Sequence, residues 1–494
     1  MNRASGVLLH ISSLPGGNGI GSLGKNAYKW VDLLNRAGQR YWQILPLNPT
    51  GYGNSPYQSI STFAGNPYFI DLEELRRLRL LTAKELEEFP VENERLVNYE
   101  AVKASRKQLL KRACERGIPK FQREFADFKE SNNHWLFDYA MFAALKDHYG
   151  GLPLQEWEEN VRLREPGTLM KLAKELQQEI EEYRFEQFLF AMQWAKLKAY
   201  ANDKGIFIIG DLPIYVSADS ADVWTHPQIF NLDEIAGCPP DAYAPDGQVW
   251  GNPTYRWDML AQSGYGWWVM RMAHMMKLYD VVRLDHFRGF ASYFSVPAGA
   301  TTAKDGVWKN GPGKGLFDAL SAALGPLPLM VEDLGYLTWE VFDLLDKCGY
   351  PGTKVLEFAF DESKSSIYLP YQYDKNCVVY TGTHDNDTAV GWYQKLDKKA
   401  KGFFHEYVGE RPKDVSQTLV RMALASSGNW CILPAQDILG LGSECRMNTP
   451  STVSDQNWAF RLLEEELNMK HFTALKKWTE IYGRNQNRDS LAMK

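Results

Sequence analysis

Short runs of apolar and β-branched residues, each ending in polar residues, recur along the chain. Each run is nearly continuous in apolar residues, which is typical of a parallel strand buried on both faces. We predict eight strands, at Gly6–Ile11, Tyr41–Leu47, Ile206–Val216, Val281–Phe287, Pro328–Gly335, Lys354–Phe360, Cys377–Asp385 and Trp430–Leu439.

The segments between most of these runs have helical patterning. Asn26–Ala37 follows the first run, and Trp339–Lys347 carries apolar residues at helical spacing. Eight strand–helix repeats fit the α/β class and a (β/α)8 TIM barrel. We therefore predict that residues 1–494 form a single barrel domain.

Two connections are too long to be simple helices. The first, residues 72–205, is rich in Glu, Lys, Arg and Leu, and we expect a mainly helical subdomain inserted in the barrel. Four apolar residues there lie on one helical stripe and predict a long amphipathic helix: Phe185, Phe188, Leu189 and Met192.

The second long connection, residues 217–280, is expected to hold a loop over Gly237–Pro253 and then a helix near Trp267–Leu278. Trp268, Met272, Met275 and Met276 form a stripe on that helix. We interpret this stripe as core packing rather than a cofactor site.

Composition narrows the function. Hydrophobic residues make up 45% and charged residues 23%, which is typical of a globular protein. The net charge is −6 without a long basic run, so nucleic acid is not an expected partner. The 16 Trp, 25 Tyr and 24 Phe residues can fill a core, and they can also offer flat apolar surfaces to sugar rings.

The cysteines and the apolar stretches point to a cytoplasmic protein. The six cysteines are widely spread without a CxxC, so we expect reduced thiols rather than disulfides or zinc. The apolar stretch Val7–Ile11 is too short for a signal peptide. The stretch Ala319–Val331 is broken by glycine and prolines, so we expect no membrane span.

Four predicted strands end in a carboxylate: Asp211, Asp285, Glu332 and Asp385. A single carboxylate after a strand is usually a helix cap or a turn residue. Four of them at one end of a barrel would repel each other, and such clusters separate the pKa values of an acid and an anion. The active site of a TIM barrel lies at this end of the strands.

Arg283 and Asp285 lie two residues apart on a strand and so point to the same side. The guanidinium would favour an ionised Asp285, as a nucleophile requires, although a structural ion pair is the alternative. Glu332 then suits the general acid and base, whereas Asp333 faces the other way as a cap or supporting residue.

Histidines near these acids suit sugar binding better than metal binding. His286 and His384 flank the carboxylates and could donate hydrogen bonds to sugar hydroxyls. The nine histidines include no HExxH, and the sequence has no Walker A motif. We therefore expect neither a metal nor a nucleotide cofactor.

The blocks around the carboxylates carry a resemblance to a known family. Residues 283–290 (RLDHFRGF), 331–335 (VEDLG) and 381–388 (TGTHDNDT) are similar to signature blocks of the amylomaltases, the disproportionating enzymes of the α-amylase-like barrels. Further similar blocks include residues 46–47, 55–58, 64–67, 210–214, 250–253 and 446–448. The resemblance runs from about Gly6 to about Trp458, nearly the whole chain.

The resemblance implies a 4-α-glucanotransferase that needs no cofactor. Its donors would be maltooligosaccharides, maltodextrin, amylose or glycogen-derived glucans, and the acceptor would be glucose or another glucan. Retaining enzymes of this chemistry hold two carboxyls roughly 5–5.5 Å apart. Asp285 would be the nucleophile, Glu332 the acid and base, and Asp385 a group that binds sugar hydroxyls and distorts the ring.

The resemblance also implies binding residues. Arg283, His286 and His384 would support the donor site, while Asp211 and Tyr57 would line the innermost sugar position, Tyr57 by stacking. Asn448 would be a further sugar contact. A flexible lid over the acceptor would include Asp241, Tyr243 and Trp250. The family often has two aromatics after the aspartate of this lid, and the first is Ala242 here.

A hydrolase and a non-catalytic glucan-binding barrel are the two rival functions. A lid that excludes water separates a transferase from an α-1,4-glucan hydrolase, and residue types alone leave both possible. A non-catalytic glucan-binding barrel would lack one of the three catalytic carboxylates, and all three are present. The resemblance favours transfer.

Overall fold

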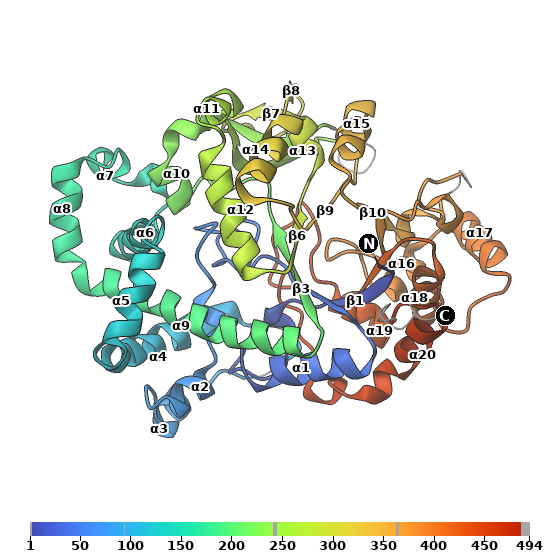
Figure 1. Ribbon diagram of the computed structural model, residues 1–494, viewed down its shortest axis with the longest axis horizontal. Coiled ribbons are helices and arrows are strands. Elements are labelled where there is room, and N and C mark those ends of the chain that lie inside the picture. The colour runs from blue at the N-terminus through green and yellow to red at the C-terminus, as the bar shows by residue number, and fades with distance from the viewer. Residues whose placement is uncertain (1, 93, 241–244, 362–364, 486–494) are drawn as a thin grey trace.

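The computed structural model describes residues 2–92, 94–240, 245–361 and 365–485. Eight parallel strands form one sheet in the order β10-β11-β12-β1-β2-β3-β6-β9 (Figure 1). The Val331 amide of β9 donates to the Pro351 carbonyl beside β10 at 3.0 Å, which brings the two sheet edges together. The strands are β1 (Ala4–Leu8), β2 (Tyr41–Gln43), β3 (Phe207–Leu212), β6 (Val281–Leu284), β9 (Leu329–Val331), β10 (Gly352–Val355), β11 (Cys377–Tyr380) and β12 (Trp430–Pro434).

The predicted (β/α)8 barrel is therefore confirmed, with strands shorter than the apolar runs. Beyond Gln43, for example, the apolar residues Ile44, Leu45 and Leu47 are buried but no longer in a strand. An apolar run predicts which residues are buried rather than where a strand ends. The loops beyond the strand ends are buried here as well, so the runs extend past the strands.

Helices surround the barrel (Figure 1). α12 buries Trp268, Met272 and Met275 at 1% exposure or less, which confirms that its stripe is core packing. The helices that follow barrel strands or their loops include α1 (Lys25–Arg36), α10 (Ala221–Thr225), α11 (Trp257–Gln262), α12 (Gly266–Leu278), α13 (Arg288–Ala291), α14 (Lys314–Leu324), α15 (Trp339–Cys348), α16 (Ala389–Lys395), α17 (Lys398–Val408), α18 (Val415–Ala425), α19 (Ala435–Leu439) and α20 (Thr473–Ile481).

The long connection between β2 and β3 projects to the left of the barrel in Figure 1. The amphipathic helix predicted there is α9, which buries Phe185, Phe188 and Leu189 against α4 and α6. Its helices are α2 (Leu72–Arg77), α3 (Ala83–Glu88), α4 (Tyr99–Lys120), α5 (Gln122–Ser131), α6 (Leu136–His148), α7 (Glu159–Arg162), α8 (Pro166–Glu175) and α9 (Gln177–Asp203).

A second, antiparallel sheet has the order β5-β4-β7-β8. Its strands are β4 (Phe230–Cys238), β5 (Gln248–Tyr255), β7 (Ser292–Pro297) and β8 (Val307–Asn310). The prediction of a loop over Gly237–Pro253 was therefore wrong, because both ends of that segment pair in this sheet. The strands escaped detection because β4 and β5 have irregular burial and β5 contains a proline. In the described part of the chain, no helix is long and apolar enough to cross a membrane.

Candidate active site

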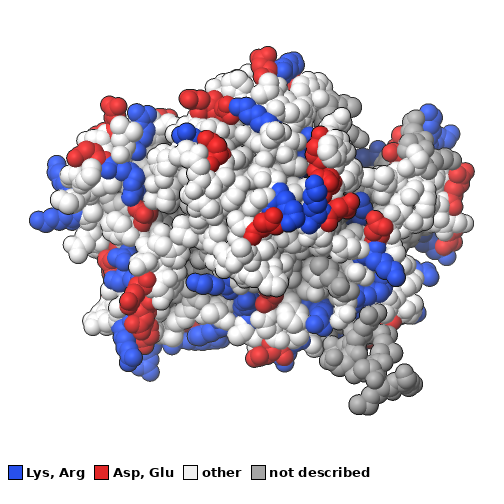
Figure 2. All heavy atoms as spheres, turned by 45° about the horizontal axis from the view of Figure 1, so that its top comes forward, with Lys and Arg blue, Asp and Glu red and all other residues white. Residues whose placement is uncertain are grey.

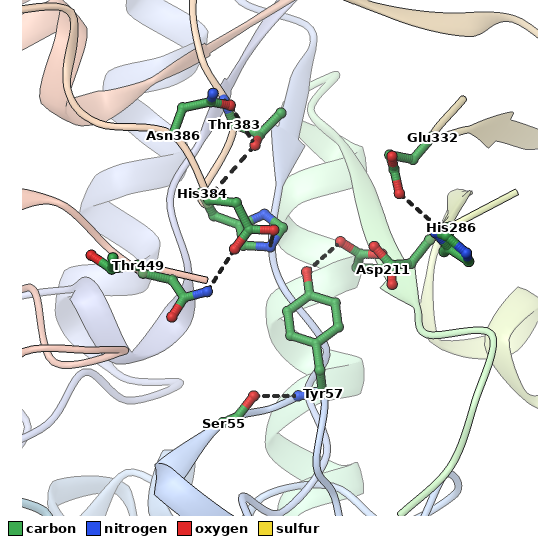
Figure 3. A network of polar contacts seen from close by, with 12 residues as sticks. Ser55, Tyr57, Asp211, His286, Glu332, Thr383, His384, Asn386 and Thr449 are labelled. Carbon is green, nitrogen blue, oxygen red and sulfur yellow. Dashed lines mark hydrogen bonds and ion pairs between the residues drawn. The ribbon is translucent and has the colours of Figure 1, made fainter. Parts of the chain in front are cut away.

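A cleft of about 630 Å³ opens at the carboxyl ends of the barrel strands. It is bordered by the loops after β6, β9 and β11, by the segment around Tyr57 and by β5. Eight of the sequence-predicted site residues line it: Tyr57, Trp250, Asp285, His286, Glu332, His384, Asp385 and Asn448. Figure 3 shows several of these side chains converging from different loops.

Arg283 is the buried cation at the base of this site. Its Nη1 donates to Asp211 Oδ2 at 2.6 Å and to Asp285 Oδ1 at 3.0 Å. Its Nη2 lies 3.9 Å from Glu332 Oε2. The Arg283 side chain is only 4% exposed, so solvent screens these pairs weakly. One fixed guanidinium therefore holds three carboxylates from three neighbouring strand ends.

Glu332 is oriented by two backbone amides. His286 N donates to its Oε2 at 2.7 Å, and Leu334 N donates to its Oε1 at 3.1 Å. Burial and the nearby charge of Asp285 raise the pKa of Glu332 to about 8, against the opposing influence of Arg283 and the two amides. Near pH 7 this carboxyl is protonated and can act as an acid.

Asp285 and Glu332 thus differ in environment. The Asp285 side chain is 24% exposed and shares a hydrogen bond with Arg283, whereas the Glu332 side chain is 13% exposed and farther from that cation. Two carboxyls with such separate environments can serve as one anion and one acid.

His286 has a backbone conformation that is uncommon outside glycine, with φ at 50°. This turn directs the His286 amide at Glu332. The His286 ring meets Trp250 edge-on, with 4.8 Å between ring centroids. Burial lowers the pKa of His286 to about 4, partly offset by Asp285, so its imidazole is neutral and can both donate and accept hydrogen bonds.

Asp385 lies in the loop after β11 with its side chain 46% exposed to the cleft. Asn448 Nδ2 donates to Asp385 Oδ1 at 2.6 Å, and His384 Nε2 lies 3.4 Å from Oδ2. The Arg446 guanidinium donates to the Asp385 carbonyl and, at 2.7 Å, to the Asn448 carbonyl. Asp385 is therefore held firmly while remaining accessible.

Tyr57 lines the cleft as expected, whereas Asp211 lies behind it. The Tyr57 hydroxyl donates to Asp211 Oδ2 at 2.9 Å (Figure 3), and its ring stacks on His384 with 5.2 Å between centroids. Asp211 is 1% exposed and does not line the cleft. The expectation that Asp211 lines the innermost sugar position is therefore wrong, because Tyr57 and Arg283 occupy the space in front of its carboxylate.

Three residues near the site were not predicted. Gln58 Nε2 donates to the Trp250 carbonyl at 2.9 Å, and Trp458 packs near both Tyr57 and His384. Arg446 fixes Asp385 and Asn448. Gln58 and Arg446 stand inside blocks already singled out, whereas Trp458 follows the last strand in an irregular segment that no periodicity marks.

Two expected site residues, Asp241 and Tyr243, lie outside the described residues. Over the part of the chain that is described, no group of three or more His, Cys, Asp or Glu side chains could hold a metal ion.

Comparisons with known proteins find one family throughout. A family model described as 4-alpha-glucanotransferase matches residues 9–466. A 4-alpha-glucanotransferase of Clostridium butyricum is 42% identical over 96% of this chain and 100% of its own length. One of Thermus thermophilus is 44% identical over 97% of this chain and 98% of its own length. The solved amylomaltase of Streptococcus agalactiae in complex with acarbose is 40% identical, with a TM-score of 0.95 over 98% of this chain and 100% of its own.

Proposed function

The chain belongs to the 4-alpha-glucanotransferase family, and from this premise we propose that Asp285, Glu332 and Asp385 carry out the transfer in the cleft. The reaction moves a segment of a 1,4-α-D-glucan to the 4-hydroxyl of glucose or of another glucan. The observation that carries the assignment is the pair of cleft carboxyls around Arg283, with Asp285 Oδ1 at 3.0 Å and Glu332 Oε2 at 3.9 Å from its guanidinium nitrogens.

In the first step, the Asp285 carboxylate attacks the anomeric carbon of the donor sugar. The glycosidic C–O bond breaks, and Glu332 gives its proton to the departing 4-oxygen. The product is a β-glucosyl ester on Asp285 and a free glucan end. Arg283 holds the attacking carboxylate in place through the hydrogen bond from its Nη1 to Asp285 Oδ1 at 3.0 Å.

In the second step, Glu332 acts as the base. It takes the proton of the acceptor's 4-hydroxyl, whose oxygen attacks the anomeric carbon and displaces Asp285. Two inversions at one carbon retain the α configuration. Glu332 loses a proton to the departing oxygen in the first step and regains one from the acceptor in the second, so the enzyme returns to its starting state without a cofactor.

Asp385 binds hydroxyls of the donor ring and favours its distortion toward the transition state. Support comes from its accessibility and from the fixed geometry given by Asn448 and Arg446. His286, His384 and Trp250 border the same space, and Tyr57 supports His384 by stacking.

Maltooligosaccharides, maltodextrin, amylose and glycogen-derived glucans are the proposed donors, with glucose or a glucan as the acceptor. The solved Streptococcus agalactiae relative has acarbose bound. A cytoplasmic location stays a prediction; it is supported by six cysteines that are widely spread along the sequence without a CxxC.

Incubation of the purified protein with maltotriose alone tests this function. Resolution of the products by chain length should show glucose and a ladder of longer maltodextrins, with constant total reducing ends. A rise in reducing ends with only shorter products would indicate hydrolysis instead.

A further inference from the structure

An exposed aromatic surface lies next to the loop that carries Glu332. Its members, here called the outer aromatic surface, are Trp308 of β8 and Tyr336, Trp339 and Phe342 on and before α15. Their exposures are 41%, 71%, 71% and 42%, and none of them is among the residues that line the cleft. Large exposed apolar patches on a folded chain generally mark binding sites, and this one includes two tryptophans.

Arg288 fixes part of this surface. Its guanidinium carbon lies 3.8 Å from the centre of the Trp308 ring and 5.6 Å from that of Tyr336. The same guanidinium donates to the Tyr336 carbonyl. Arg288 itself is only 4% exposed, so it packs beneath the two rings and does not cover their exposed faces. The rings are held in place before any ligand binds, which reduces the entropy lost on binding.

Two short segments of the chain connect the outer aromatic surface to the active-site loops. Tyr336 follows Glu332 by four residues, with a turn at Gly335 where φ is 85°. Arg288 follows Asp285 by three residues, and α13 packs against α15. The outer aromatic surface therefore begins a few residues after Glu332, the proposed general acid.

The position relative to Glu332 decides which part of a glucan could reach it. A general acid protonates the leaving oxygen, so it lies on the leaving-group side of the scissile bond. We propose that the outer aromatic surface binds an α-1,4-glucan chain on that side, several sugars beyond the cleft. Trp308 and Trp339 would stack on the apolar faces of glucose rings. This inference rests on the proposed function.

Chain length is the property that would reveal such a site. The surface lies outside the cleft, so maltotriose is too short to occupy both, whereas a long amylose occupies them together. Occupation of the outer site therefore lowers the KM for long chains and leaves the chemical step alone.

The experiment compares Trp308→Ala and Trp339→Ala, singly and together, with the wild type. KM and kcat are measured for a long amylose and for maltotriose. Phe137→Ala is the matched control, because Phe137 is 44% exposed on α6 and has the Arg184 guanidinium 5.9 Å from its ring centre. We expect each variant to raise the amylose KM about three- to tenfold, the effect of one lost ring contact. Maltotriose kinetics and the control should match the wild type.

Three other results would overturn the proposal. Equal KM values for amylose in the wild type, the tryptophan variants and the control would show that the surface does not bind glucan. Wild-type activity on maltotriose would at the same time leave the proposed function intact. Parallel losses on maltotriose and amylose would indicate damage to the cleft. Wild-type self-association in sedimentation that the variants lose would assign the surface to a second copy of the chain.

Discussion

Arg283 bonds Asp211 and Asp285 through the same nitrogen, at 2.6 and 3.0 Å. Asp211 is fully buried, while Asp285 faces the cleft, so the guanidinium links an internal charge to a reactive one. Burial raises the pKa of Asp211 against the effect of Arg283. One side chain thus contacts both a buried carboxyl of the barrel and a carboxyl that lines the cleft.

We expect Arg283→Met to impair both stability and activity. Removal of one partner from a buried ion pair leaves an uncompensated charge and lowers the free energy of unfolding by about 3–5 kcal/mol. Adding Asp211→Asn removes that charge, so the double variant should recover stability in denaturant unfolding. It should not recover kcat, because Asp285 still lacks its cation. Full stability in the single variant would contradict this account of the pair.

Asp285→Asn should abolish turnover and keep the fold. An amide cannot form the glycosyl ester, and loss of a covalent nucleophile lowers kcat by a factor on the order of 10⁴ to 10⁶. The assay is maltotriose disproportionation, with circular dichroism as the test of folding. Asp318→Asn is the control, since that carboxylate is on the exposed α14 surface and pairs only locally with Lys314. If the Asp285 variant is nearly as active as the wild type, Asp285 takes no part in the reaction.

The raised pKa of Glu332 predicts the alkaline limit of activity. The acid form is needed for the first step, so kcat/KM should fall as the pH rises through about 8. Glu332→Gln should lose most activity, and its residual rate should not show this fall at alkaline pH. A wild-type rate that stays flat well above pH 8 would disagree with a protonated Glu332.

The same group affects stability with a defined sign. A carboxyl whose pKa rises from 4.5 to about 8 binds more protons in the folded than in the unfolded state between those values. The free energy of unfolding therefore decreases as the pH rises from about 4.5 to 8. In Glu332→Gln this contribution should vanish, which denaturant unfolding at pH 5 and pH 8 can measure.

The strand ends allowed the three carboxylates of the cleft, Asp285, Glu332 and Asp385, to be predicted, because the ends of parallel strands meet at one face of a barrel. How deeply each carboxylate is buried could not be predicted in the same way. Asp211 occupies an equivalent strand end yet lies behind Tyr57. The antiparallel sheet was missed because β8 is exposed at most positions and lacks an apolar run. Trp458 follows the last strand, where only the folded loop places it near His384.

Arg446 should act as a positioning residue for Asp385 and Asn448. It bonds both backbone carbonyls, so Arg446→Ala should let the two side chains shift and lower kcat by about 100-fold, as expected for misplacement near 1 Å. Asn448→Ala should lower activity through the same lost contact, and the double variant should show less than the sum of the two effects. Additive effects, or complete activity in Arg446→Lys without either bond, would assign Arg446 a separate role.

Tyr57→Phe separates the hydroxyl of this residue from its ring. The phenyl ring can keep the stack on His384, but Asp211 Oδ2 loses the donor at 2.9 Å. Oδ2 keeps Arg283 as its other donor, so the loss of this one hydrogen bond lowers the free energy of unfolding by about 0.5–1.5 kcal/mol. We expect this loss in denaturant unfolding, together with a modest fall in kcat/KM, since Arg283 would turn further toward Asp211 and away from Asp285. Tyr57→Ala should be worse in KM because it also removes the ring from the cleft. If Tyr57→Phe equals Tyr57→Ala in every measurement, the hydroxyl alone carries the role of Tyr57, and the stack on His384 has no part in binding.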